Sequence, residues 1–263
     1  MIPKKIHYIW FGGNPLPEEA KTFIKTWKKT CPDYEIIRWD ESNFDITSND
    51  YVHEAYQARK WAFVSDYVRL WALVSYGGIY MDTDVEVLKN LDSFLNHKAF
   101  SGFESPDAIP TGIMACEKGF PLFSELLHDY DNRHFVLSDD TYDLRTNVMM
   151  ITRYCLGKGL LLNNSYQEIE GLALYPNDWF CPKSHDTGQI NLTANSVTIH
   201  HFNGSWVDPL EKKLLTERRE ILSKHPTIPP LVAGAFVRLR YGVKHGDFAP
   251  LLKMIALYQK SRE

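Results

Sequence analysis

The segment Gly77-Gly78-Ile79-Tyr80-Met81-Asp82-Thr83-Asp84 places two glycines before three apolar residues and two carboxylates after them. The glycine pair is typical of a helix C-terminus, and the three apolar residues that follow predict a strand. Side chains two residues apart on an extended chain point to one face, so Tyr80, Asp82 and Asp84 lie together. Such carboxylates suit a hard divalent cation such as Mg²⁺ or Mn²⁺, although so short a pattern also fits a solvated acidic turn.

The helical stretch before this segment carries a second charged pair. From Tyr51 to Tyr76 the apolar residues recur mostly at three- and four-residue spacing, which predicts one long amphipathic helix or two abutting ones. Within Ser65-Asp66-Tyr67-Val68-Arg69, the two charged residues are three apart and share a helical face. They form either a routine intrahelical ion pair or part of a cleft, in which Arg69 contacts phosphate or sugar and Asp66 holds sugar hydroxyls.

Strands and helices continue on both sides and predict one α/β domain, residues 1–207, with a helical C-terminal extension, residues 208–263. Aromatic and β-branched runs indicate the strands, and three- to four-residue periodicity indicates the helices. The expected strands are residues 6–11, 34–39, 79–81, 85–88, 100–103, 112–116 and 196–201, and the expected helices are residues 17–29, 51–76, 122–130 and 147–156.

The composition excludes several classes of protein. Of the 263 residues 44% are hydrophobic and 24% charged, as in an ordinary globular protein, and a net charge of −4 disfavours a strongly basic nucleic-acid binder. The four cysteines form no CxxC pair, which argues against a zinc ribbon or a disulfide scaffold and fits a reducing compartment. Neither an apolar signal region nor an apolar stretch of 18 residues occurs, so we expect a cytoplasmic protein. From the net charge we expect no nucleic-acid partner.

Two further segments carry residues suited to a nucleotide ligand. Trp10 ends the first expected strand, before Gly12-Gly13, and is either a core tryptophan or an aromatic platform for a base. A late strand ends in His200-His201-Phe202-Asn203-Gly204-Ser205-Trp206. A histidine here could serve as a third metal ligand. The Ser205 hydroxyl and the Trp206 indole N–H could donate hydrogen bonds to phosphate. The alternative is an edge-strand histidine with a loop aromatic.

Taken together, four motifs in this order resemble the DXD-motif glycosyltransferases of the family-32 type: IHYIWFGG, SDYVRL, GGIYMDTDV and HHFNGSW. That group includes the yeast initiating mannosyltransferase and the α1,4-galactosyltransferases, and it is related to the catalytic domain of the large clostridial glucosylating toxins. The likeness is dense over residues 1–100 and returns at 197–206. It implies a GT-A fold, with a Rossmann-like α/β domain and a mostly parallel central sheet.

The resemblance also implies roles for single residues. Asp82, Asp84 and Arg69 would be catalytic, with Asp84 ligating Mn²⁺ or Mg²⁺ directly and Asp82 reaching the metal through water. His200 would be the metal-ligating histidine, with His201 as the alternative. The donor-binding residues implied are Trp10, Ser65, Asp66, Arg69, Tyr80, Asp82, Ser205 and Trp206, with Trp10 stacking on the base.

The activity implied is metal-dependent, retaining transfer of a hexose from a nucleotide-diphosphate sugar to a hydroxyl of a saccharide or lipid-linked saccharide acceptor. We favour a UDP-sugar and a role in bacterial capsule, O-antigen or lipopolysaccharide synthesis. The alternatives are a GDP-mannose-dependent mannosyltransferase and a non-catalytic nucleotide-sugar binding protein on the same fold. A phosphohydrolase would normally need more carboxylate ligands than the DTD segment supplies.

The acceptor side is the least transferable part of the resemblance. Relatives often carry a Gly-Pro dipeptide near residue 147, where this chain has Thr146-Asn147. After residue 208, lysines and arginines alternate with leucine, phenylalanine and tyrosine. This segment is either a solvated helical face or a peripheral contact with the inner face of the plasma membrane.

Overall fold

The computed structural model describes residues 1–105, 108–109, 112–204 and 207–260. The chain divides into two compact units, and each is described by itself. The first comprises Met1–Lys183 and Asn191–Phe202, and the second comprises Ser184–Ile190 and Asn203–Glu263. The sequence placed a boundary at 207/208, whereas the units separate at 202/203 and the second unit also takes residues 184–190.

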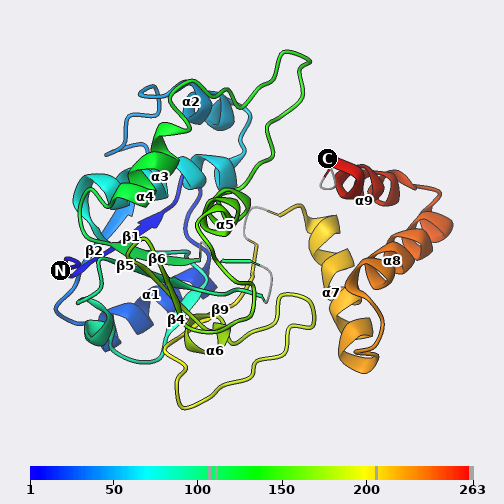
Figure 1. Ribbon diagram of the computed structural model, residues 1–263. Helices are drawn as coiled ribbons and strands as arrows, with labels where there is room; N and C mark the ends of the chain where they lie inside the picture. Colours follow the sequence, from blue (N-terminus) through cyan, green and yellow to red (C-terminus); the bar gives the residue numbers. More distant parts are fainter. Residues whose placement is uncertain (106–107, 110–111, 205–206, 261–263) are drawn as a thin grey trace. The chain divides into compact units, whose positions relative to one another are not determined.

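A sheet forms the centre of the first unit (Figure 1). It has seven strands in the order β2-β1-β3-β6-β5-β8-β7. Strands β2, β1, β3, β5 and β8 run in one direction, and β6 and β7 run in the other. The mixed α/β class with a mostly parallel sheet is therefore confirmed. The strands are β1 (Lys5–Ile9), β2 (Glu35–Trp39), β3 (Gly78–Met81), β5 (Ala99–Gly102), β6 (Ile113–Cys116), β7 (Gln167–Ile169) and β8 (Leu172–Tyr175).

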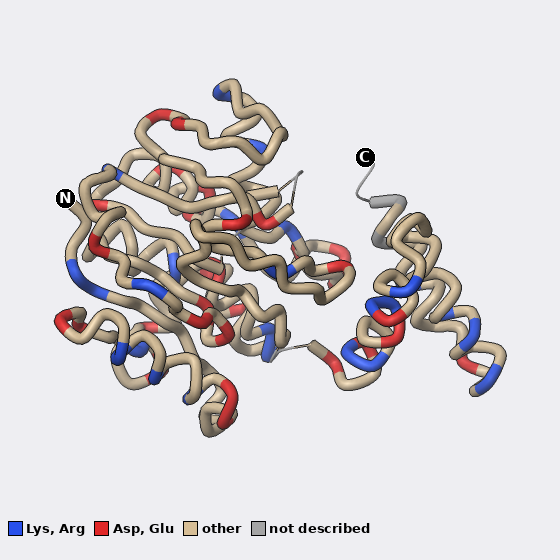
Figure 2. Tube along the Cα trace, turned by 90° about the horizontal axis from the view of Figure 1, so that it is seen from below, with Lys and Arg blue, Asp and Glu red and all other residues tan. Residues whose placement is uncertain are grey.

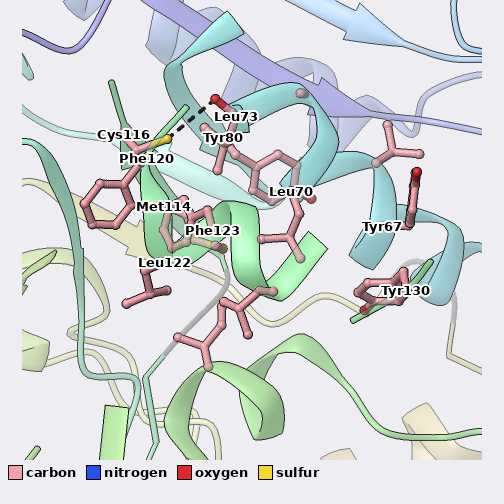
Figure 3. Close-up of a cluster of buried hydrophobic side chains, with 14 of the residues drawn as sticks. Tyr67, Leu70, Leu73, Tyr80, Met114, Cys116, Phe120, Leu122, Phe123 and Tyr130 are labelled. Carbon is pink, nitrogen blue, oxygen red and sulfur yellow. Dashed lines mark hydrogen bonds between the residues drawn. The ribbon is translucent and has the colours of Figure 1, made fainter. Parts of the chain in front are cut away.

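Helices cover both faces of the sheet, and each strand sends alternate side chains to opposite faces. In β3, Tyr80 joins one buried cluster while Ile79 and Met81 join the other. Figure 3 shows the first cluster, in which Tyr80 and Met114 pack near Leu70 and Phe123. The helices of this unit are α1 (Glu18–Thr30), α2 (Asp50–Gln57), α3 (Trp61–Tyr76), α4 (Pro121–His128), α5 (Asn147–Gly157) and α6 (Asn177–Phe180), with a short 3₁₀ turn at Asp92–Phe94.

The periodic stretch from Tyr51 to Tyr76 is two helices, not one. Arg59, between α2 and α3, has φ of 55°, in the left-handed region that interrupts a helix. Three elements, β7, β8 and α6, had no counterpart among the expected ones. Each has only three or four residues, too few for a periodic pattern to show.

A second, two-stranded sheet joins distant parts of the chain. β4 (Val85–Val87) follows the DXD segment directly, and it pairs antiparallel with β9 (Thr198–His200). The register sets Val85 opposite His200. This pairing brings the late histidine motif to the carboxylate segment.

The second unit is helical, with α7 (Pro209–Lys224), α8 (Pro230–His245) and α9 (Ala249–Lys260). Proline begins α7 and α8, where its missing N–H costs nothing. Buried apolar residues such as Leu214 and Val237 form its interior, and an Arg238–Glu211 ion pair joins α8 to α7. Among the described residues, the helices are too short or too polar to cross a membrane.

Candidate active site

Three ligand-bearing side chains meet where β3 and β9 end. Asp82 and Asp84 follow β3, and His200 is the last residue of β9. His200 Nε2 lies 3.3 Å from Asp84 Oδ1 and 3.7 Å from Asp82 Oδ2. One ligand atom from each of the three lies within 4.8 Å of the others. The structure thus brings together the three residues that the sequence proposed around a metal.

The structure separates the two neighbouring histidines. His201 stacks on Phe23 at a ring distance of 4.5 Å, and its Nε2 lies 2.9 Å from Glu86 Oε2. Successive residues of an extended chain point to opposite faces, so His201 turns away when His200 faces the carboxylates. The geometry therefore favours His200 over His201 as the ligand.

The electrostatics of this cluster suit a cation. Burial lowers the pKa of His200, but the carboxylates of Asp84 and Asp82 outweigh burial and hold it well above its ordinary value. Two carboxylates so close together need a compensating positive charge, which either a proton on the imidazole or a divalent cation provides. Two carboxylate oxygens and an imidazole nitrogen are ligands that Mn²⁺ and Mg²⁺ sites accept, so the donor set fits such an ion.

Gly112 makes room for the His200 ring. A Cβ atom at this position would lie 2.7 Å from His200 Nδ1, which is closer than real Cβ contacts come. The carbonyl of Gly112 also accepts a hydrogen bond from the Asp82 N–H at 2.9 Å. This glycine contacts both the histidine ring and the backbone of the first aspartate.

A buried ion pair on α3 borders the cluster. Arg69 Nη2 lies 3.2 Å from Asp66 Oδ1 and 3.7 Å from Asp82 Oδ1. The guanidinium also covers the Tyr80 ring at 4.6 Å, and the Tyr80 hydroxyl donates to Asp82 Oδ1. Burial lowers the pKa of Arg69, but Tyr80, Asp82 and Asp66 raise it above its usual value, so the guanidinium stays charged. Arg69 thus forms the intrahelical ion pair with Asp66 and also reaches the DXD carboxylate, while its contact with phosphate or sugar stays a prediction.

Asn147 is a member of this network that the sequence did not assign. Its backbone N–H lies 3.2 Å from Asp66 Oδ2, and its side-chain amide donates to the Asp66 carbonyl at 2.6 Å. The Tyr130 hydroxyl donates to Asn147 Oδ1 at 2.8 Å. The only sequence signal was the departure at Thr146-Asn147, because a contact 81 residues away leaves no local pattern.

Of the remaining proposed donor-binding residues, the structure describes Trp10 and Ser65. Trp10 directly follows β1, and His7 in β1 is in register with Tyr80 in β3, so Trp10 and Asp82 leave the sheet at the same edge. The Trp10 indole N–H donates to the Asn14 carbonyl at 2.7 Å and its side chain is half-buried. The Ser65 carbonyl accepts from Arg69 Nε. Ser205 and Trp206 lie outside the described residues.

Part of this chain matches a known protein family. Residues 17–101, which include α3, β3 and both DXD carboxylates, match the model of the glycosyltransferase sugar-binding region containing the DXD motif. The match covers 85 of the 263 residues. The match ends before β9, so His200 lies outside the DXD region.

Individual relatives cover the chain to different extents. Inositol phosphoceramide mannosyltransferase 3 of Schizosaccharomyces pombe is 33% identical over 142 residues, which are 51% of this chain and 40% of that protein. Inositol phosphoceramide mannosyltransferase 1 of the same yeast is 26% identical over 234 residues, 81% of this chain and 68% of that protein. Among solved structures, the glycosyltransferase GlyE of Streptococcus pneumoniae is similar with a TM-score of 0.44 and 10% identity, covering 92% of this chain and 64% of that one.

Proposed function

We propose that this protein is a metal-dependent glycosyltransferase that moves a hexose from a nucleotide-diphosphate sugar to an acceptor hydroxyl. The observation that carries the proposal is the meeting of Asp82, Asp84 and His200 beside the buried Arg69–Asp66 pair. Carboxylates and an imidazole suit the cation, and the adjacent guanidinium suits the anionic part of the donor. The DXD family of residues 17–101 supports the same class of reaction.

Each residue of the cluster has a role in this proposal. Asp84 and His200 would hold Mn²⁺ or Mg²⁺, which supplies Lewis-acid stabilisation of the leaving diphosphate when bound. Asp82 would accept hydrogen bonds from ribose and sugar hydroxyls, because Tyr80 and Arg69 hold its carboxylate in place. Arg69 adds a fixed positive charge beside the carboxylates. This charge would stabilise the negative charge that develops on the leaving diphosphate.

The transfer is proposed to retain the anomeric configuration. The bond between the sugar C1 and the diphosphate oxygen breaks, and a bond from C1 to the acceptor oxygen forms on the same face. The proton of the acceptor hydroxyl passes to the departing phosphate. Assignment of the product anomer by NMR tests this directly, and an inverted product would contradict it.

The donor sugar has two candidates. The sequence favoured a UDP-hexose and bacterial polysaccharide synthesis, while two relatives are named inositol phosphoceramide mannosyltransferases and favour mannose. A panel of UDP-glucose, UDP-galactose and GDP-mannose with Mn²⁺, read by nucleotide release, distinguishes the two. The names of the relatives also favour a lipid-linked acceptor over a free saccharide.

The test of the metal assignment is Asp84→Ala. We expect loss of Mn²⁺-dependent donor hydrolysis and transfer, with a tryptophan fluorescence spectrum like that of the wild type. Asp33→Ala is the matched control, because this exposed carboxylate pairs with Lys4 on the surface. Full activity of Asp84→Ala would overturn the assignment, and nucleotide-sugar binding without turnover in the wild type would favour a non-catalytic binding protein.

We also propose that the second unit makes a peripheral contact with the inner face of the plasma membrane. In α8, Val232, Phe236, Leu239 and Val243 recur at helical spacing and are 54%, 56%, 47% and 73% exposed. Lys244 directly follows the most exposed of them. An apolar stripe beside basic residues is the pattern of helices that lie in the membrane interface.

A further inference from the structure

A groove of about 1310 Å³ runs along α5 in the first unit. One wall is α5 itself, drawn in green in Figure 1, and the other is formed by the segment from His128 to Asp143 that follows α4. This volume exceeds the ~300–1,000 Å³ that is usual for a small-molecule site. The groove is therefore large enough for an extended ligand.

The walls of the groove are apolar and only partly covered. Met149 and Leu156 on α5 are 53% and 46% exposed, and Val136 and Leu137 on the opposite wall are 36% and 41% exposed. Methionine side chains fit ligands of varied shape because they are unbranched and flexible. Four large apolar side chains facing one groove favour a ligand that has an alkyl portion.

The groove is also positively charged. Three arginines and two aspartates line it, so that its charge is positive even when its histidines are neutral. Asp143 is already held by two guanidiniums, at 2.6 Å from Arg133 Nε and 2.6 Å from Arg145 Nη2. Arg153 is exposed, and no residue of the described ranges forms an ion pair with it. One carboxylate between two arginines, with a third arginine close along α5, leaves positive charge for an anionic group.

Positive and apolar side chains alternate along the groove. Met149, Arg153 and Leu156 follow one another at spacings of four and three residues, so they form one stripe of α5, and Arg145 lies in the groove just before the helix N-cap Thr146. A ligand with a phosphate group and an alkyl chain matches this order. A neutral sugar would leave the arginines without a partner, and a simple anion would leave the apolar walls uncovered.

The start of α5 relates the groove to the buried Asp66–Arg69 pair. The α5 wall begins at Val148, next to Asn147, which bonds Asp66. On the other side, Ala108 lines the groove, and the next residue, Ile109, donates its N–H to Thr152 Oγ1 in α5. The groove therefore begins one residue from Asn147, whose partner Asp66 pairs with Arg69.

We propose that this groove binds the acceptor and that the acceptor is an anionic amphiphile, with its phosphate at Arg145 and Arg153 and its alkyl chain along Met149, Leu156 and Leu137. The assignment as an acceptor site rests on the proposed function. The binding itself does not, because it needs neither donor nor metal.

The experiment is titration calorimetry with dodecyl phosphate below its micellar concentration. Dodecyl maltoside supplies the same chain without charge, and inorganic phosphate supplies the charge without a chain. We expect dodecyl phosphate to bind at least about tenfold more tightly than either. Arg153→Gln and Met149→Gln should each weaken binding by about tenfold, because one removes the charge and the other the apolar contact.

Matched controls lie outside the groove. Lys158→Gln removes an exposed cation just past α5, and Leu161→Gln replaces a side chain that is 63% exposed. Both should bind dodecyl phosphate as the wild type does. Equal binding by all four variants would overturn the proposal, because it would show non-specific adsorption of the amphiphile.

Two further measurements separate this proposal from the proposed function. Binding of UDP or GDP with Mn²⁺ should stay within about twofold when dodecyl phosphate is saturating, and complete displacement would place the amphiphile in the donor site and overturn the groove assignment. Asp84→Ala should still bind dodecyl phosphate. Failure of donor turnover would thus contradict the proposed function while leaving groove binding measurable.

Discussion

At the scale of single residues, His7 shows how one side chain supports the turn before the DXD strand. It is fully buried in β1, its Nδ1 accepts from the Trp39 indole N–H at 3.1 Å, and its Nε2 lies 2.8 Å from the Gly77 carbonyl. Because Nδ1 accepts, Nε2 carries the proton and donates to Gly77. The ring is thus held neutral, with both nitrogens used.

This arrangement predicts a pH dependence of stability. Burial lowers the pKa of His7, so the unfolded chain binds a proton that the folded chain resists. The contribution of neutral His7 is complete above its ordinary pKa of about 6.5 and is lost as the pH falls from there through the folded value. We expect the free energy of unfolding in urea to drop less between pH 7.5 and 5.5 in His7→Gln than in the wild type; an equal drop in both would contradict this.

Gly112 predicts a steric effect on the metal ligands. Gly112→Ala would place a Cβ 2.7 Å from His200 Nδ1 and displace the ring. We expect Mn²⁺ affinity, measured by calorimetry, to fall about 10- to 100-fold, as when the support of a metal-ligating histidine is lost. Gly157→Ala is the control, since its added Cβ meets nothing within 4 Å. An unchanged affinity in Gly112→Ala would show that His200 is not a ligand.

At the scale of elements, Asn147 joins α5 to α3. Its amide and backbone N–H bond to Asp66, and Tyr130 bonds to the same side chain. Asp66 is buried, which raises its pKa, while Arg69 and the Asn147 N–H oppose that effect. The first residue of α5 therefore helps to keep Asp66 charged beside Arg69.

This link predicts different effects for two neighbouring substitutions. Asn147→Ala leaves buried partners unsatisfied and should cost about 1–3 kcal/mol of stability, together with weaker nucleotide binding. Thr146→Ala removes only the N-cap bond of α5 to Met149 and should cost about 0.5–2 kcal/mol without a change in nucleotide binding. Denaturant unfolding and calorimetry separate the two, and equal nucleotide affinity in both variants would show that Asn147 has no positioning role.

The length of each element explains whether the sequence predicted it. The long helix α1, expected at residues 17–29, agrees closely because hydrophobic periodicity survives over many residues. The hairpin of β7 and β8 did not stand out, because two short apolar runs are consistent with several structures. The break at Arg59 was left open, since a single positive φ leaves no pattern in the sequence.

At the scale of the whole molecule, charge is unevenly divided between the two units. The second unit has 11 lysines and arginines against 7 aspartates and glutamates, a net charge of +4, which leaves −8 for the first unit. Figure 2 shows basic residues along the helices of the second unit, interspersed with acidic ones. The overall value of −4 therefore averages over an acidic α/β unit and a basic helical one.

This division predicts binding to anionic vesicles. The full chain should float with vesicles that contain phosphatidylglycerol, less so at high salt, and not with neutral phosphatidylcholine vesicles. Phe236→Ser combined with Val243→Ser should reduce flotation at least about threefold, because it removes apolar area from the α8 stripe. Leu161→Ser combined with Leu192→Ser, in the first unit, is the control. Unchanged flotation of the α8 variant would contradict the predicted contact.

The sequence by itself determined the α/β class, the carboxylate pair and the residues grouped around it, because strand alternation and residue spacing act over a few positions. The tertiary structure decided which histidine faces Asp84, how Asn147 reaches Asp66 and where a groove opens along α5. The first two depend on strand register and on contacts between segments about 80 or more residues apart, and the groove depends on how α5 packs beside the segment before it. Local patterns carry no information about such distances, since only packing of the whole unit brings these side chains together.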